Sequence, residues 1–424
     1  MTLAIVVVVL LLLLFSGLPV AFSLAALGTV MLMIKGLPLI MVAQNLHGAI
    51  DNFILLSVPL FLLMSNILLK GGVGRDLFDA VQSWVGHWPG GMAVATLLSC
   101  GLFSAISGSS VATAATVGTV AIPEMTKRGY SRSFTFGLLA AGGTLGILIP
   151  PSIPLIVYGV IAEESIGKLF LAGIGPGLLL IFLFSVYAVL NAVMTSDYER
   201  SAKASWLDRR NATIRAIPTG MLAVIMVGGI YAGIFTPTEA SAVGATAALF
   251  LTVFVLRTLT WPDFVQAVRA TLSTTVVLFL VVIGAKIFGK AVTLYQVPMQ
   301  VSQLVDTHVS SVWLFLLIVA AILLFIGLFL ESLSMLLIMV PVLFPTVLAL
   351  HVDPIWFGIF FVVLIEIALI TPPVGLNLFV IQAIAQSPLG EIVRGVLPFI
   401  AIMLFSVLLI WIFPDIVMFI PNRL

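Results

Sequence analysis

Two proline pairs interrupt apolar stretches of this chain: GGTLGILIPPSIP at residues 142–154 and ALITPPVGLNLF at residues 368–379. A proline pair removes two backbone donors and frees carbonyl groups in the preceding helical turn. Irregular backbone at membrane depth persists only where protein or water satisfies its polar groups. We therefore interpret both stretches as helices that break inside a membrane and present polar atoms to a ligand; a simple proline kink is the alternative.

The rest of the chain has the composition of an integral membrane protein. Its 424 residues are 62% apolar and 8% charged, with a mean hydropathy of +1.28, whereas soluble domains are about 45–50% apolar and about 25% charged. A net charge of +1 gives no basic surface for nucleic acid, and the single cysteine, Cys100, cannot form an intrachain disulfide. No polar stretch is long enough for a nucleotide-binding domain. We predict an all-α polytopic membrane protein that is neither a soluble enzyme nor, by itself, an ATP-driven pump.

A shift of 222 residues superimposes the second half of the chain on the first. The register extends over about 150 residues without a gap, as expected for a duplicated unit. It aligns both proline pairs, and it also aligns Ser110 with Ser332, Pro123 with Pro345, Ser165 with Ser387 and Pro176 with Pro398. We predict an N-terminal membrane segment at 1–17, repeat 1 at 18–194, a cytoplasmic basic loop with a linking span at 195–237, and repeat 2 at 238–418.

Each repeat contains one apolar block that is too long for a single membrane span and too short for two. These blocks lie at 92–122 and 311–344. The first is interrupted by SGSS at 107–110, and the second by Glu331 and Ser332. We predict two re-entrant hairpins, each followed by one of the Pro-Pro-broken helices, at 134–160 and 355–382.

Basic residues orient the two repeats in the membrane. The positive-inside rule places the loop 195–215 in the cytoplasm, since it carries Arg200, Lys203, Arg209, Arg210 and Arg215. Counting spans onward places the C-terminus outside, so the repeats enter the membrane from opposite sides. Inverted repeats with broken helices near the midplane are typical of secondary transporters. Segments 36–52 and 258–269 correspond in the two repeats and have mixed polarity, which predicts interfacial arm helices.

The hydroxyl-rich tip of the first hairpin, SAISGSSVATAAT at 104–116, is the first candidate site. Its small residues allow close approach, and hydroxyl and carbonyl oxygens at a helix break are ligands that suit Na⁺. Tight helix packing is the alternative. Hydroxyls and backbone amides at the breaks can also hold a substrate carboxylate. The candidate substrate ligands are Ser110, Thr113, Pro150, Pro151, Ser332, Pro372, Pro373 and Asn377.

Two carboxyl groups fall inside the apolar blocks of repeat 2. Glu331 lies at the tip of the second hairpin, where it can ligate Na⁺ or exchange a proton, because an ionisable group inside a membrane is costly and usually functional. A structural pair with Lys286 or Lys290 is the alternative. Glu366 lies shortly before the second proline pair, and a site role and a structural role are equally open for it.

Three motifs resemble those of the large membrane subunit of tripartite ATP-independent periplasmic (TRAP) transporters: SGSS at 107–110, GILIPPS at 146–152 and ITPPVGLN at 370–377. The similarity covers essentially the whole chain. It implies an elevator-type, Na⁺-coupled carrier of organic acids such as dicarboxylates or sialic acid in the bacterial inner membrane. It also implies two partners, a small four-helix membrane subunit and a periplasmic substrate-binding protein, and no organic cofactor.

The same resemblance implies two sets of Na⁺ ligands. The first set comprises Ser107, Gly108, Ser109 and Ser110 of the hairpin tip, with Gly143, Thr144 and Ile147 at a break in the following helix. The second set comprises Glu331, Thr371 and Gly375.

Import of an organic anion driven by Na⁺ is therefore the leading function, and we weigh three others. An enzyme that used Ser109 as its nucleophile would need a base within reach, and no His or Lys lies in a matching segment, so we predict no enzymatic activity. A channel would give single-channel currents far above carrier turnover. A proton-coupled carrier that uses Glu331 or Glu366 is the nearest alternative, and replacing Na⁺ by choline would separate it from the leading function.

Overall fold

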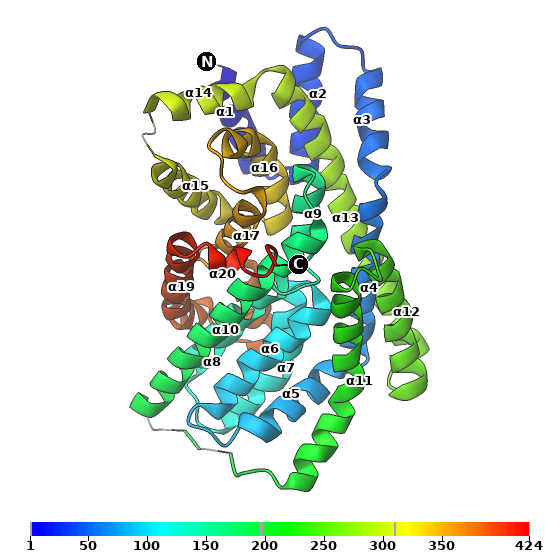
Figure 1. Ribbon diagram of the computed structural model, residues 1–424, viewed down its shortest axis with the longest axis vertical. Helices are drawn as coiled ribbons and strands as arrows, with labels where there is room; N and C mark the ends of the chain where they lie inside the picture. The colour runs from blue at the N-terminus through cyan, green and yellow to red at the C-terminus, as the bar shows by residue number, and fades with distance from the viewer. Residues whose placement is uncertain (1, 196–197, 200, 309–310, 424) are drawn as a thin grey trace.

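The computed structural model describes residues 2–195, 198–199, 201–308 and 311–423, and every regular element in these ranges is a helix (Figure 1). Arg200, one of the basic residues assigned to the cytoplasmic loop, lies outside the described residues. Within these ranges, seven helices are long and apolar enough to cross a membrane, or eight if one bent helix pair counts as a span. The predicted all-α polytopic membrane class is therefore confirmed.

The N-terminal half starts with α1 (Thr2–Phe15), which a turn at residues 16–19 separates from α2 (Val20–Ile34). The elements that follow are α3 (Ile40–Ile50), the 3-10 turn η1 (Phe53–Leu56), α4 (Ser57–Lys70), α5 (Val73–Val85), α6 (Gly91–Ser107), α7 (Ser110–Lys127), α8 (Arg132–Leu148), α9 (Ile153–Ala162) and α10 (Ile166–Thr195). Then α11 (Trp206–Tyr231) leads into the second half, and a capping box between Ser205 and Asp208 fixes its first residue.

The C-terminal half follows a similar order of elements, with one long helix in place of α3, η1 and α4. It comprises α12 (Pro237–Phe250), the π-helical turn η2 (Leu251–Val255), α13 (Trp261–Leu294), α14 (Val297–His308), α15 (Val312–Gly327), α16 (Ser332–Ala349), α17 (Pro354–Leu369), α18 (Leu376–Ala385), α19 (Leu389–Ile412) and α20 (Asp415–Met418). Proline occupies the first turn of α12, α13 and α17, where its missing N–H would have no helical partner.

The boundaries of the helices keep the 222-residue register. Helices α7 and α16 begin at Ser110 and Ser332, and helices α8 and α17 begin at Arg132 and Pro354. The packing exchanges partners in the same register: α2 lies against α13 while α4 lies against α12 (Figure 1), and α18 packs on α7 while α9 packs on α16. Each half therefore completes its packing with helices of the other half.

The arm helix predicted at 258–269 is not a separate element. Residues from Trp261 onward belong to α13, which continues for 34 residues to Leu294. After Pro262 in its first turn, no Gly or Pro interrupts this helix before Gly284, so the hydrogen-bond ladder continues through the expected joint. The elements that lead into the two hairpins are α5 and α14.

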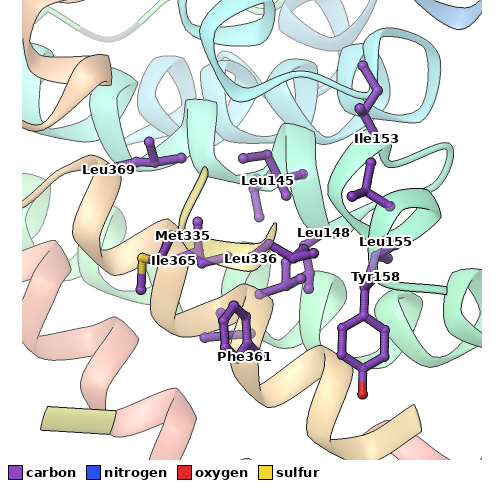
Figure 2. Close-up of a cluster of buried hydrophobic side chains, with 14 of the residues drawn as sticks. Leu145, Leu148, Ile153, Leu155, Tyr158, Met335, Leu336, Phe361, Ile365 and Leu369 are labelled. Carbon is purple, nitrogen blue, oxygen red and sulfur yellow. The ribbon is translucent and has the colours of Figure 1, made fainter. Parts of the chain in front are cut away.

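The apolar core joins both halves beside the two helix breaks. Leu145 and Leu148 of α8 form one cluster with Met335 and Leu336 of α16 and Phe361 of α17 (Figure 2). All five side chains are buried. Helices in a membrane are held together by van der Waals packing rather than by exclusion from water, and this cluster packs the second hairpin and its broken helix against the first broken helix.

Candidate functional site

The first hairpin turns at residues 107–110, between α6 and α7. Gly108 adopts a left-handed conformation with φ of 61°, and a Cβ atom there would lie 2.5 Å from the carbonyl oxygen of Pro151. Only glycine satisfies both conditions. Ser109 then caps α7 by accepting a hydrogen bond from the Ala112 N–H at 3.3 Å. The tip therefore lies directly against the first proline pair.

A hydroxyl network fills this tip. Ser107 Oγ and Thr113 Oγ1 are 2.8 Å apart, and Thr113 Oγ1 donates to the carbonyl oxygen of Ser109 at 2.9 Å. Ser107, Ser110 and Thr113 are all buried. Three oxygen atoms, those of the Ser107 and Thr113 hydroxyls and of the Ser109 carbonyl, are thereby collected at the hairpin tip, which is a suitable start for a site that replaces the hydration shell of a small cation.

The first helix break lies at residues 149–152, later than predicted. Helices α8 and α9 meet there at 40°, and the Pro150–Pro151 peptide is cis. Gly143, Thr144 and Ile147 lie inside α8, and Thr144 Oγ1 donates to the carbonyl oxygen of Ala141 at 2.7 Å. The predicted break at 143–147 was wrong because the restriction imposed by proline acts on the residue directly before it, here Ile149.

The second break, at residues 370–375, lies where the sequence placed it. Thr371 Oγ1 donates to the carbonyl oxygen of Ile367 at 2.6 Å, and Gly375 adopts a left-handed conformation with φ of 49° before α18 begins. The Pro372–Pro373 peptide is also cis. In contrast to Pro150 and Pro151, which are buried, Pro372 is partly exposed and Pro373 is exposed.

The second hairpin tip differs chemically from the first. Glu331 occupies the N-cap position of α16, but its side chain makes no capping bond. Glu331 Oε1 accepts a hydrogen bond from Ser334 Oγ at 3.3 Å, and within the described ranges neither Lys286 nor Lys290 forms an ion pair with it. The alternative of a structural lysine pair is therefore not supported. Ser332, the first residue of α16, is half-buried beside it.

Two buried polar side chains near the breaks lack full partners. Asn377 donates from Nδ2 to Ser110 Oγ at 2.6 Å and to the carbonyl oxygen of Ala140 at 3.2 Å, while its Oδ1 accepts nothing among the described residues. Glu366, about one turn before the C-terminal end of the buried helix α17, has no hydrogen-bond partner for either carboxyl oxygen within the same ranges. The contact of Asn377 with the first tip was not anticipated from the sequence.

A polar cavity between α5 and α11 was also missed. Its volume is about 230 Å³, and Asp76, Asp79, Asp208, Asn211, Ala212 and Arg215 line it. Burial raises the pKa of Asp79, and the nearby Arg75 opposes that effect. Beside the cavity, Arg209 of α11 donates from Nε to the carbonyl oxygen of Ser83 of α5 at 3.1 Å. The amphipathic pattern of α5 was the available signal for this interface.

No group of three or more His, Cys, Asp or Glu side chains that could hold a metal ion occurs in the described part of the chain. A transition-metal centre, which would draw on such groups, has no candidate there. The oxygen atoms gathered at the two tips and breaks are hydroxyl, carbonyl and carboxylate groups instead. This is the donor set of a hard cation.

Similarity to known proteins covers almost the whole chain. Residues 7–416 match the family model described as "Tripartite ATP-independent periplasmic transporter, DctM component". The C4-dicarboxylate TRAP transporter large permease protein DctM of Pseudomonas aeruginosa is 40% identical over 384 residues, which cover 90% of this chain and 89% of that protein. The sialic acid TRAP transporter large permease protein SiaM of Vibrio cholerae is 37% identical over 411 residues, which cover 97% of this chain and 96% of that protein.

The fold also occurs in a more distant transporter. The crystal structure of the Alcanivorax borkumensis YdaH transporter matches with a TM-score of 0.60 over 88% of this chain and 87% of that chain. Sequence identity is 14%, so this likeness concerns the fold alone.

Proposed function

Because this chain belongs to the DctM family of large permeases of tripartite ATP-independent periplasmic transporters, we propose that it imports an organic anion by Na⁺-coupled secondary transport. The relatives named above carry C4-dicarboxylates and sialic acid, which suggests a carboxylate substrate here. The observation that carries the proposal is the pair of hairpin tips, each packed beside a proline-broken helix and each rich in oxygen atoms.

We propose that one Na⁺ binds at each tip. Ser107, Ser109 and Thr113 supply hydroxyl and carbonyl oxygens to the first site, together with the carbonyl groups that become free where α8 ends. Glu331, Thr371 and the free carbonyls of the 370–375 break supply the second. A bound Na⁺ offsets the negative charge of a carboxylate substrate, and the N-termini of α7 and α16 favour the same anion. Ion and substrate then stabilise each other's binding, which is the requirement for coupling.

The proposed mechanism is an elevator built on an inverted repeat. Residues 92–160 and 314–382 form the moving unit, and α2, α4, α12 and α13 contribute to the scaffold. The shared 222-residue register of the helix starts and the reciprocal packing of α2 with α13 and α4 with α12 support this division. The charge of the loop 195–215 supports the inverted orientation.

The proposed partners follow from the tripartite family. A small four-helix membrane subunit would pair with this chain, and a periplasmic binding protein would deliver the substrate to it. We place the complex in the bacterial inner membrane, where a periplasmic partner and an inward Na⁺ gradient are both available.

Uptake by proteoliposomes tests the proposal. The vesicles contain this chain and its small subunit, and loaded binding protein is added outside. We expect an inward Na⁺ gradient to drive uptake, choline in place of Na⁺ to abolish it, and Glu331→Gln to weaken its dependence on Na⁺ concentration without loss of folded protein. Full uptake in choline under a pH gradient would instead establish the proton-coupled alternative, for which Glu331 and the unpartnered Glu366 are the candidate groups.

A further inference from the structure

Asn377 connects the second repeat to the ion site proposed in the first. It lies in the first turn of α18, directly after the 370–375 break, and its side chain is fully buried. Its Nδ2 donates to Ser110 Oγ at the hairpin tip and to the Ala140 carbonyl of α8. One amide of repeat 2 therefore holds together the two elements of repeat 1, α7 and α8, that line the first site.

The contact depends on a close approach of three helices. A Cβ atom on Gly143 of α8 would lie 2.7 Å from Ala114 Cβ of α7 and 3.2 Å from Asn377 Nδ2. Any residue larger than glycine at this position would push α7 and α18 away from α8. Small residues at helix contacts in membranes are the usual means of bringing backbones this close.

The amide also has an unused acceptor. Asn377 Oδ1 is buried and has no donor among the described residues. A buried acceptor without a partner is destabilising, so this amide is not explained by packing alone. A ligand that enters beside Ser110, such as a cation or a hydroxyl donor, would supply the missing partner.

Repeat 1 has no equivalent of the Asn377 contact. The residue of repeat 1 that corresponds to Asn377 in the 222-residue register is Leu155, which is buried in α9 and has no polar group to offer to α16. The second tip has its own carboxylate at Glu331 and its own hydroxyl partner at Ser334. The first tip therefore depends on the second repeat in a way that the second tip does not depend on the first.

We propose that Asn377 is a positioning residue that couples the two proposed ion sites. Na⁺ at the second site orders the 370–375 break, and the ordered break fixes the position of the first turn of α18. Asn377 in that turn then holds Ser110 in the geometry that the first Na⁺ requires. Since such linkage is reciprocal, binding of the two ions is positively cooperative. This inference rests on the proposed Na⁺ sites.

Na⁺ titrations of uptake, and of the thermal unfolding midpoint of the purified complex, test the coupling. The wild type is expected to give a Hill coefficient above one. Asn377→Leu, which keeps the approximate volume and removes the amide, should bring it close to one and raise the Na⁺ concentration for half-maximal uptake at least about fivefold. Asn377→Ser, whose hydroxyl is too short to bridge both acceptors, should act in the same direction and serves if the leucine variant does not fold.

Asn66→Leu is the matched control. Asn66 Nδ2 of α4 donates to Thr271 Oγ1 of α13 at 3.1 Å, so this variant removes a comparable bond between helices outside the tips. Its Hill coefficient should equal that of the wild type. An unchanged Hill coefficient in both Asn377 variants, with Na⁺ dependence retained, would overturn the coupling.

Hydrogen exchange in Na⁺-free buffer separates this inference from the proposed function. Asn377→Leu should speed amide exchange at residues 110–113 of α7 as well as at 376–378 of α18. If wild-type uptake shows no Na⁺ dependence, the proposed function fails, and joint deprotection of the two segments still supports the link between them. Faster exchange confined to α18 contradicts the link.

Discussion

Replacing Gly146 by alanine tests whether the close approach of the first hairpin to α8 builds the first ion site. A Cβ atom on Gly146 would lie 2.4 Å from the carbonyl oxygen of Ser109 and 2.7 Å from Thr113 Oγ1. Non-bonded atoms settle at roughly 3.5 Å or more, so the tip would have to move by about 1 Å. The atom in the way belongs to the backbone of the tip, and a side-chain rotation cannot relieve the clash.

One favourable and two unfavourable terms set the magnitude of the change in stability. Alanine is favoured over glycine inside a helix by about 1 kcal/mol, whereas overpacking a tight contact costs about 1–3 kcal/mol and losing the bond from Thr113 to Ser109 costs about 1 kcal/mol more. We expect a net destabilisation of about 1–3 kcal/mol. If this cost falls on the ion-bound tip, it corresponds to a loss of Na⁺ affinity of about 5- to 150-fold.

The assay is thermal unfolding with and without Na⁺, together with Na⁺ titration of uptake. Gly228→Ala in α11 is the control, because no atom lies within 4 Å of the added Cβ and we expect stability to rise by about 0.5–1 kcal/mol. Gly146→Ala should lower the unfolding midpoint and raise the Na⁺ concentration for half-maximal uptake. If Gly146→Ala matches the control in both measurements, the contact between tip and helix is not part of the ion site and this reasoning is refuted.

The remaining predictions concern the charge of Asp79 in α5 and the orientation of the loop that precedes α11. Burial raises the pKa of Asp79 from its usual 3.8, so the ionised carboxylate destabilises the folded state. Asp79→Asn should therefore raise the unfolding midpoint at pH 7. The gain should vanish near pH 4, because protonation of Asp79 removes the same cost from the wild type. A pH series of unfolding curves checks this, and a gain that grows on acidification would contradict it. The cysteine of Ser205→Cys should not react with a membrane-impermeant maleimide in intact cells but should react in inverted vesicles. Background labelling should be low because Cys100 is buried. Labelling from outside intact cells would reverse the proposed orientation.

Local chemistry explains why the sequence predicts the elements around the site. Proline pairs interrupt helices wherever they occur, and Ser109 and Ser152 cap the helices that follow the breaks. The glycines of α8 were misleading, because in a buried membrane helix they mark close packing rather than a break. Gly143 faces Ala114, and Gly146 faces the Ser109 carbonyl.

The contacts that make these elements a site could not be predicted in the same way. Periodicity identifies the apolar face of a helix but not the helix that covers it, and Asn377 meets Ser110 across 267 positions of sequence. In a repeat, a contact in one half predicts an equivalent contact in the other half. No such prediction is possible for Asn377, because the corresponding residue in repeat 1 is Leu155. The 222-residue register predicts where the two tips lie. Their chemistry differs because the residues at corresponding positions differ: the first tip is neutral, rich in hydroxyl groups and takes a polar partner from repeat 2, whereas the second tip carries its own carboxylate at Glu331.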